Sequence, residues 1–222
     1  MASFSNAETG NKPADPYTSK NIQDPSLKEK VEDLQGFVDK SKFCMMTTKT
    51  QDGLLASRCM ALAARVSCQH TTPRTFRTSQ LTPAPQEDNG IDFIFHTNTE
   101  SGKTDDLAQN PNINLAFLNN AGEWASISGV ATIETDRARV EQFYSAGLKA
   151  WLGDLGDGVH DGGPKDPRIG LIKVKSKTAQ YAISRRTAIG GAVEFAKGVV
   201  TGDAAQVNKL RHIEASEVDQ CK

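Results

Sequence analysis

Residues 43–66 have the sequence 43-FCMMTTKT-50, 51-QDG-53 and 54-LLASRCMALAARV-66, which is two largely apolar runs around a short polar turn. Apolar runs of this kind, bounded by turn residues, are typical of β-strands. The Asp-Gly pair supplies a residue that adopts positive φ at little cost, as a tight hairpin requires. The segment therefore predicts an antiparallel hairpin at the start of an antiparallel sheet.

Further strand-like runs follow along the chain, and most are joined by short connections. They cover residues 91–97, 113–119, 124–135, 168–175 and 178–184. Gly129 lies inside the long run WASISGVATIET and indicates a bulge or a close approach of another backbone. Antiparallel sheets of about six strands often close into a barrel, because closure removes the exposed edges. We therefore predict a mainly β (α+β) fold that contains a small barrel.

Helices are expected at several places around this sheet. Ser26 and Glu29 form a capping box, and the apolar residues behind it predict an amphipathic helix that ends near Lys40. A short helix is predicted over 101–110 and one helix over 137–152, capped by Asp136. Residues 188–202 are expected to form a short helix and a further strand.

The length of 222 residues is compatible with one domain, which we place at residues 26–215. Residues 1–25 are polar and lack a hydrophobic period, so they are predicted to form a flexible arm. Residues 67–90 are rich in proline and poor in apolar residues, which indicates an insertion loop. Residues 216–222 are assigned to a C-terminal tail.

The overall composition excludes several classes of partner. Lys and Arg number 26 against 27 Asp and Glu, so no basic field favours nucleic acid or an anionic membrane. No apolar run approaches the length of a membrane span, and the N-terminus lacks a signal sequence, so a cytoplasmic protein is expected. The four cysteines show no C-x-x-C spacing, and disulfides are not expected.

The stretch 96-HTNTESGKTDDL-107 carries the strongest binding motif. Its Gly102-Lys103-Thr104 resembles the end of a nucleotide triphosphate loop, but Thr97 stands where that loop requires glycine. Thr97, Ser101 and Lys103 nevertheless flank the start of a predicted helix, which favours an anion. Arg58, on a separate strand, can hold phosphate oxygens bidentately. Solvated surface charge is the alternative for Lys103 and Arg58 individually.

Other candidate sites are weaker. Acidic residues and a histidine in the loop 154-DLGDGVHDGG-163 invite a metal hypothesis, but the spacing does not fit an EF-hand, so no metal is predicted. His70, His96 and His212 are scattered along the sequence and predict no zinc site. No activated serine or cysteine nucleophile is recognisable, so any redox or transfer chemistry would depend on a cofactor.

Four segments together resemble a known family. They are 57-SRCM-60, 93-FIFHTNTESGK-103, 124-WASISGVATI-133 and 147-GLKAWLGDLGDGVHDGGPKDPRIGLIKVKSKTAQYAISRR-186. The chain resembles the FMN-binding split-barrel proteins of the pyridoxamine 5′-phosphate oxidase-like superfamily over roughly residues 26–215. Within it, the general stress protein branch and its fungal blue-light-inducible relatives are the most similar. The resemblance implies a six-stranded antiparallel split β-barrel with flanking helices.

The resemblance also implies a cofactor and a set of binding residues. Arg58 would bind the phosphate of FMN, with the backbone of Cys59 and Met60 beside the flavin ring. Thr97, Ser101 and Lys103 match the family's T-N-x-x-S-x-K phosphate segment. Such proteins are homodimers with the flavin at the interface, so three residues would reach the flavin bound mainly by the other subunit: Trp124, Lys149 and Trp151. Core or interface packing is the alternative for the tryptophans, and surface exposure for Lys149. FAD is possible if the interface has room for the adenylate.

Two functions remain open from the sequence. One is a flavin-dependent oxidoreductase that accepts a hydride from NADH or NADPH, with Lys149 stabilising the anionic reduced flavin. The other is a non-catalytic flavin carrier or sensor. Oxidation of pyridoxamine phosphate itself is not expected, because Arg211-His212 does not match the Arg-x-His segment that engages that substrate. Haem handling has only His96 and His160 in its favour.

Overall fold

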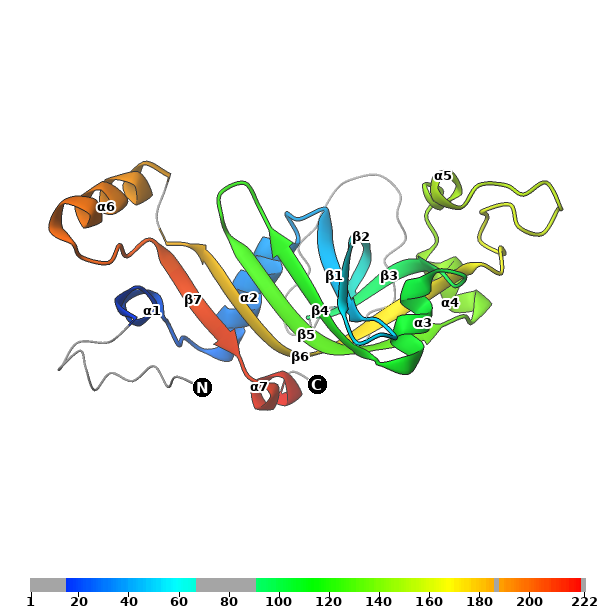
Figure 1. The fold of residues 1–222 in the computed structure, drawn as a ribbon, viewed down its shortest axis with the longest axis horizontal. Coiled ribbons are helices and arrows are strands. Elements are labelled where there is room, and N and C mark those ends of the chain that lie inside the picture. Colours follow the sequence, from blue (N-terminus) through cyan, green and yellow to red (C-terminus); the bar gives the residue numbers. More distant parts are fainter. Residues whose placement is uncertain (1–14, 67–90, 186–187, 221–222) are drawn as a thin grey trace.

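The computed structural model describes residues 15–66, 91–185 and 188–220, so the predicted insertion at 67–90 lies outside the described residues. Strands and helices are interspersed along these residues (Figure 1). The strands are β1 (Phe43–Lys49), β2 (Leu55–Val66), β3 (Asp92–Asn98), β4 (Asn112–Leu118), β5 (Trp124–Glu134), β6 (Ile169–Ser184) and β7 (Asn208–Ile213). The helices are α1 (Pro16–Asn21), α2 (Leu27–Val38), α3 (Gly102–Gln109), α4 (Arg137–Phe143), α5 (Leu148–Leu152), α6 (Ala188–Thr201) and α7 (Ala215–Gln220).

The predicted hairpin is confirmed. Strands β1 and β2 pair antiparallel from Phe43 opposite Ala61 to Lys49 opposite Leu55. Gly53 in the turn has φ of 86°, a conformation in which a side chain would be strained. The hairpin starts a seven-stranded sheet of order β3-β2-β1-β4-β5-β6-β7, and an additional β3–β6 pairing closes the first six strands into a barrel. The predicted six-stranded antiparallel split barrel is therefore confirmed, with β7 as an added strand.

The bulge predicted at Gly129 is also confirmed. The register between β5 and β6 shifts between Ser128 and Gly129. A Cβ atom at Gly129 would lie 2.4 Å from the carbonyl oxygen of Lys175, so glycine allows this close approach. The separate strands predicted at 168–175 and 178–184 were wrong as two elements, because β6 runs without interruption over 16 residues. Its pairing with β3 at one end and with β7 at the other accounts for that length.

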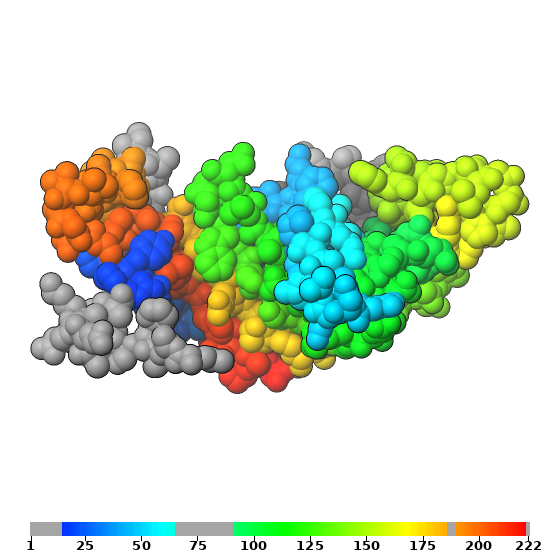
Figure 2. All heavy atoms as spheres, viewed as in Figure 1, coloured from blue at the N-terminus to red at the C-terminus, as the bar shows by residue number. Residues whose placement is uncertain are grey.

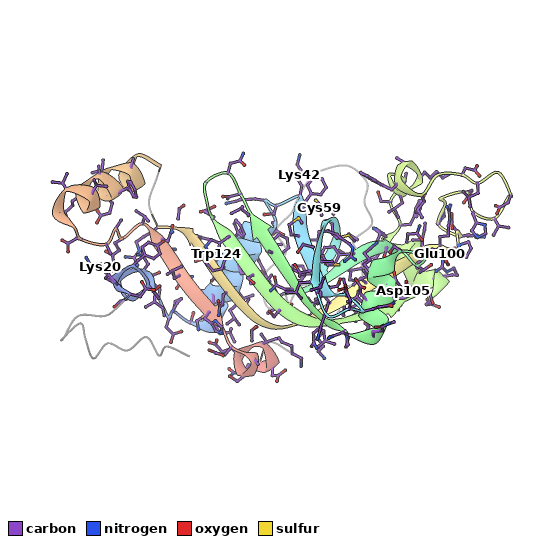
Figure 3. All side chains as sticks on the ribbon, viewed as in Figure 1. Lys20, Lys42, Cys59, Glu100, Asp105 and Trp124 are labelled. Atoms are coloured by element: carbon purple, nitrogen blue, oxygen red, sulfur yellow. The ribbon has the colours of Figure 1, made fainter. Side chains whose placement is uncertain are left out.

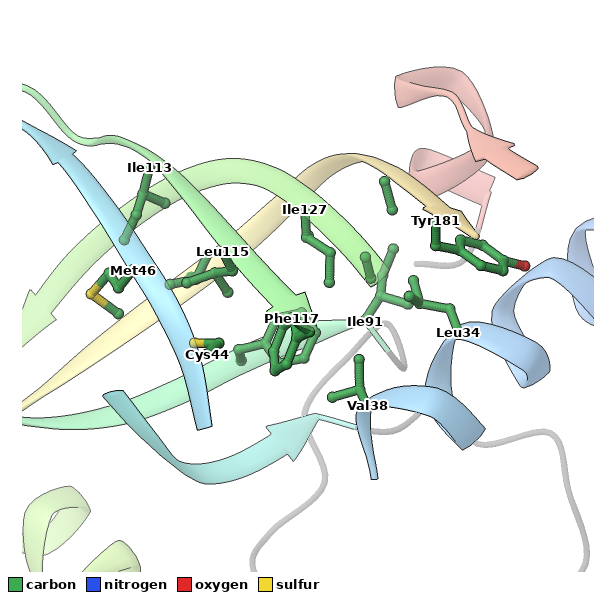
Figure 4. Packing of buried hydrophobic residues seen from close by; sticks show 14 of the residues in the cluster. Leu34, Val38, Cys44, Met46, Ile91, Ile113, Leu115, Phe117, Ile127 and Tyr181 are labelled. Atoms are coloured by element: carbon green, nitrogen blue, oxygen red, sulfur yellow. The ribbon is translucent and has the colours of Figure 1, made fainter. Parts of the chain in front are cut away.

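The barrel interior is filled by apolar side chains from all sides (Figure 4). In β1, inward Cys44 and Met46 alternate with outward Phe43 and Met45, as the pleat of a strand requires. Helix α2 contributes its apolar face to the same cluster. Ser26 caps this helix by accepting from the amide of Glu29 at 3.4 Å, which confirms the predicted start. A second cluster lies beneath α4 and includes Ile94, Val140, Phe143, Ile169 and Leu171.

The single helix predicted over 137–152 was wrong. Asp136 does cap α4, but the helix ends at Phe143, and α5 starts anew at Leu148. The phenol of Tyr144 donates to the carbonyl of Gly162 at 3.0 Å, which ties the break to the following loop. The hydrophobic periodicity of residues 137–152 carries no information about this contact with a later loop. Periodicity alone therefore could not place the break.

The two ends of the elongated molecule carry α6 and the α5 segment (Figures 1 and 2). Helix α1 lies within the segment predicted as an arm, and Asn21 at its end is fully buried beside the residues that lead into β7. The predicted helix at 188–202 is confirmed as α6, whereas the further strand is β7 at 208–213. Helix α7 lies in the segment assigned as a tail. Among the described residues, no helix has both the length and the apolarity that a membrane span needs.

Candidate functional site

The barrel register determines where Arg58 lies. Arg58 on β2 stands directly opposite Met46 on β1, whose side chain is completely buried. Residues opposite one another in an antiparallel pair share a face of the sheet, so the Arg58 side chain starts on the inner face of the barrel wall. Helix α3 packs against β1 and β5 near this point. The Arg58 guanidinium therefore meets α3 instead of extending freely into solvent.

Two side chains hold the Arg58 guanidinium. Its Nη1 donates to the hydroxyl of Thr48 at 2.8 Å, and its Nη2 donates to Asp106 Oδ2 at 2.9 Å. The Thr48 hydroxyl in turn donates to the same Asp106 oxygen at 2.9 Å. The three groups form a closed network between β1, β2 and α3. The Arg58 side chain keeps 33% of its surface exposed, whereas the Asp106 side chain keeps 8%.

The first turn of α3 brings Lys103 close enough to Arg58 for the two charges to interact. Lys103 Nζ donates to the hydroxyl of Ser101 at 2.7 Å, and this hydroxyl donates to the carbonyl of Asn98 at 2.7 Å. Ser101 occupies the N-cap position of α3, yet its side chain makes no capping hydrogen bond to the helix amides. The N-terminal turn of the helix therefore lies beside a lysine and an arginine, where its dipole adds to their positive potential.

The positive charges of Arg58 and Lys103 influence each other. Partial burial lowers the pKa of Lys103 below its ordinary 10.5, and the nearby positive charge of Arg58 lowers it further. Two cations placed this close repel each other, so an anion between them would relieve an unfavourable interaction. A phosphate matches these groups well, because guanidinium and ammonium groups both donate charge-assisted hydrogen bonds to its oxygens. We call Arg58, Ser101, Lys103 and the first turn of α3 the cationic cradle.

The other residues of the predicted phosphate and ring segments have different surroundings. Thr97 is 5% exposed, and its hydroxyl donates to the carbonyl of Asn98 at 3.1 Å, so in this structure it supports the turn before α3. Cys59 is exposed on the outer face of β2, opposite Met45. Met60 is partly buried and packs against the barrel core. The β2 backbone thus continues from the cradle along the barrel wall.

Three predicted site residues are not joined to the cradle within one chain. Trp124 begins β5 opposite Leu118 and is 36% exposed, and it lies well away from Asp105 of α3 in Figure 3. Lys149 and Trp151 lie on α5, where Trp151 is 86% exposed. Within the described parts of the chain, no hydrogen bond or ion pair connects these three side chains to Arg58, Ser101 or Lys103.

Thr48 and Asp106 were not identified by sequence reasoning. Thr48 lies in a predicted strand and Asp106 in a predicted short helix, and neither position by itself indicates a partner. The alternation in β1, which places Thr48 on the inner face with Cys44 and Met46, was the available indication that its hydroxyl is buried. No local pattern connects Asp106 to Arg58, because 48 residues separate them along the chain.

The remaining titratable candidates have structural partners. His96 Nε2 lies 2.7 Å from the carbonyl oxygen of Phe143, and burial lowers the pKa of the ring. In the 154–163 loop, Asp157 accepts from the amides of Val159 and His160 and contacts the His160 ring at 2.6 Å. Across residues 15–66, 91–185 and 188–220, the structure places no group of three or more His, Cys, Asp or Glu side chains suited to a metal ion.

Comparison with known proteins identifies relatives over most of the chain. Residues 69–206 match the family described as "Pyridoxamine 5'-phosphate oxidase like". Protein bli-3 of Neurospora crassa is 52% identical over 218 residues, which are 97% of this chain and 94% of that protein. These matches confirm the resemblance that the sequence motifs indicated.

Two crystal structures show the same fold at low sequence identity. A putative general stress protein 26 from Jannaschia sp. CCS1 has a TM-score of 0.57 and 17% identity, covering 84% of this chain and 99% of that one. A general stress protein 26-related protein from Clostridium acetobutylicum has a TM-score of 0.54 and 16% identity, covering 87% and 99%. The barrel topology and these matches together establish that the chain belongs to the pyridoxamine 5′-phosphate oxidase-like family.

Proposed function

We propose that this protein binds FMN and that the cationic cradle holds the FMN phosphate. The convergence of Arg58 and Lys103 at the start of α3 is the observation that carries this proposal. A single phosphate needs one anion site, whereas the chain of phosphates in ATP needs the glycine-rich loop that the sequence lacks. Membership of the pyridoxamine 5′-phosphate oxidase-like family, in which the sequence motifs imply FMN, supports the same cofactor.

The outer wall of the barrel supports a homodimer as the functional form. Phe43 and Met45 on β1 are 56% and 43% exposed, and Leu118 at the end of β4 is 73% exposed. Trp124 pairs with Leu118 across the β4–β5 hairpin, so a large aromatic side chain joins the same wall. Exposed apolar groups gathered on one face favour contact with another surface. In Figure 2 the β4–β5 hairpin stands beside the β1–β2 hairpin on one side of the molecule.

A second subunit on this wall would complete the flavin site. The ring of FMN would lie along β2, next to the backbone of Cys59 and Met60, while the phosphate lies in the cradle of the same subunit. Trp124, Lys149 and Trp151 of the partner subunit would then cover the ring. If the interface leaves space beyond the phosphate for the adenylate, FAD would bind in the same orientation.

A flavin oxidoreductase is the first functional candidate. NADH or NADPH would supply a hydride to the bound flavin, and Lys149 of the partner subunit would stabilise the reduced, anionic ring. The protein's own role is to bind and orient the cofactor and to adjust the potential around it.

A non-catalytic flavin carrier or sensor is the second candidate. It is favoured by the chemistry of the described side chains, because burial, with a smaller effect from Cys59, raises the pKa of the Cys44 thiol to about 12 and leaves it unreactive. His96 is likewise engaged with the backbone of Phe143. Neither group is prepared for acid–base or nucleophilic work on a substrate.

The flavin proposal is tested by titrating the protein with FMN and following flavin absorbance and fluorescence. Arg58→Ala and Lys103→Ala should each weaken FMN binding about tenfold or more, since each removes a charge-assisted contact to phosphate. Lys42→Ala is the matched control, because it removes an exposed lysine from a different part of the barrel. Equal FMN affinity in all four proteins would refute the cradle, and no binding by the wild type would refute the cofactor.

The two functional candidates are separated by anaerobic reduction of the FMN-loaded protein. Rapid bleaching of the flavin absorbance by NADH or NADPH, followed by fast reoxidation with a quinone, supports an oxidoreductase. Unchanged absorbance over the same period with both nicotinamides supports the carrier or sensor.

The dimer is tested by size-exclusion chromatography with light scattering, which measures the molar mass of the eluted protein. Met45→Glu places a charge in the centre of the exposed wall and should convert a dimer into a monomer, whereas Lys49→Glu, farther along β1, should leave the mass unchanged. A wild-type mass of one chain would exclude the dimer.

A further inference from the structure

The acidic partner of Arg58 is buried, and this burial needs an explanation. Asp106 keeps 8% of its side-chain surface exposed, and Thr48 is 1% exposed. Removing a carboxylate from water is unfavourable unless charged or hydrogen-bonding partners replace the lost solvent. Here one carboxylate oxygen accepts from both Arg58 and Thr48 at 2.9 Å. These two hydrogen bonds thus hold the Asp106 carboxylate beside the Arg58 guanidinium.

The geometry leaves the other side of Arg58 available. The contacts to Thr48 and Asp106 engage one hydrogen on each terminal nitrogen, and a guanidinium has further N–H donors in a rigid planar fork. With two points of the fork attached to β1 and α3, the plane of the group is determined. Arg58 nevertheless remains 33% exposed, so donors remain accessible to a ligand, and its charge lies near enough to Lys103 to lower the pKa of that lysine.

We infer that Asp106 and Thr48 are positioning residues for the phosphate: they hold Arg58 in the orientation that binds it, and they thereby determine how strongly the site prefers phosphorylated flavin over the same flavin without phosphate. This inference rests on the proposed function. It assigns to Asp106 a role opposite to the simple expectation that an acidic residue beside a phosphate site weakens binding.

The physical basis is pre-organisation. A free arginine side chain loses considerable rotamer freedom when it is fixed by a ligand, whereas Arg58 has already lost that freedom in the folded protein. The negative charge of Asp106 also offsets part of the repulsion between Arg58 and Lys103 before phosphate arrives. Loss of Asp106 would therefore leave a mobile guanidinium that moves away from Lys103.

The test compares the dissociation constants of FMN and riboflavin, measured by flavin fluorescence, in the full-length protein. Asp106→Asn should lower the preference for FMN about tenfold, because one charge-assisted contact orients the arginine. Thr48→Val should lower it in the same direction, and Thr48→Ser, which keeps the hydroxyl, should restore it. Glu32→Gln is the matched control, since Glu32 is an exposed acid on helix α2, outside the cradle.

Action through Arg58 is tested in the Arg58→Ala background. There Asp106→Asn should have no further effect on the FMN-to-riboflavin ratio. An unchanged or increased preference for FMN over riboflavin in a folded Asp106→Asn protein would overturn the inference while the cradle stands, provided that Arg58→Ala still lowers this preference. If Arg58→Ala leaves the ratio unchanged, the proposed phosphate site itself is wrong. Should Asp106→Asn not fold, the Thr48→Val and Thr48→Ser pair decides the matter with the same readout.

Discussion

The protein contains two arginine–carboxylate networks that are built in opposite ways. In the cradle, Arg58 is 33% exposed and its acidic partner Asp106 is 8% exposed. Between β7 and α2, Arg211 is 2% exposed, whereas its partners Glu29 and Asp33 are 52% and 28% exposed. One network buries the acid and presents the cation, and the other buries the cation and leaves the acids near solvent.

The difference separates an arginine that can bind from one that holds the fold together. Arg211 donates to Glu29 at 2.7 Å and also to Asp33, so its guanidinium joins the last strand to the helix that covers the barrel. These contacts commit the Arg211 guanidinium to the packing of β7 against α2.

The largest effect is expected from Arg211→Ala, which should lower the free energy of unfolding by about 3 kcal/mol, because it removes the shared partner of two carboxylates. The preference for FMN over riboflavin should stay as in the wild type. Urea unfolding gives the first quantity and flavin fluorescence the second.

Lys209→Ala is the matched control for this change. Lys209 Nζ lies 3.6 Å from Asp33 with a partly exposed side chain, so its removal should cost less than about 1 kcal/mol. If the Arg211→Ala protein has normal stability and an altered flavin preference, Arg211 acts in binding, and the proposed difference between the two networks is wrong.

An intermediate effect is expected when pH is raised. The pKa of Lys103 lies below 10.5 in the folded protein, so protonated lysine is disfavoured there and the charge is lost at a lower pH than in an unfolded chain. Phosphate binds the charged form, so FMN affinity should fall about tenfold as pH rises through that lowered pKa. Titration calorimetry with FMN, with riboflavin as the reference, measures this decline.

Lys103→Arg tests whether loss of the lysine charge causes the decline, because arginine stays protonated over the whole pH range of the measurement. Its FMN affinity should change much less between pH 7 and the ordinary lysine pKa of 10.5. Identical pH profiles for the two proteins would show that Lys103 does not contact the phosphate.

The smallest effect on the free energy of unfolding is expected from Tyr181→Phe. Tyr181 is buried and its hydroxyl donates to the carbonyl of Lys30 at 2.6 Å. Burial raises its pKa from 10.0 to about 12, so its contribution to stability is complete below pH 10 and is lost as pH rises toward 12. Tyr181→Phe should lower the free energy of unfolding at pH 7 by about 1 kcal/mol.

Thermal unfolding at several alkaline pH values checks this last expectation. Part of the wild-type loss of stability above pH 10 should be missing in Tyr181→Phe, while FMN affinity at neutral pH is retained. Equal alkaline losses in both proteins would show that folding does not raise the pKa of Tyr181.

Local features that depend on one residue or on its neighbours along the chain could be predicted from the amino-acid sequence. The positive φ of Gly53, the cap at Ser26 and the close approach at Gly129 follow from side-chain size and short-range hydrogen bonding, and all three are present. The combination of Arg58 with the T-N-x-x-S-x-K segment was likewise recognisable as a motif.

Features that depend on contacts between distant segments could not be predicted in this way. The continuity of β6 depends on its pairing with three other strands, and the break between α4 and α5 on a contact of Tyr144 with a later loop. The same holds for the two arginines, which are alike in the sequence. Only the fold places Asp106 behind Arg58 and encloses Arg211 between β7 and α2, because burial and long-range pairing are properties of the packed chain.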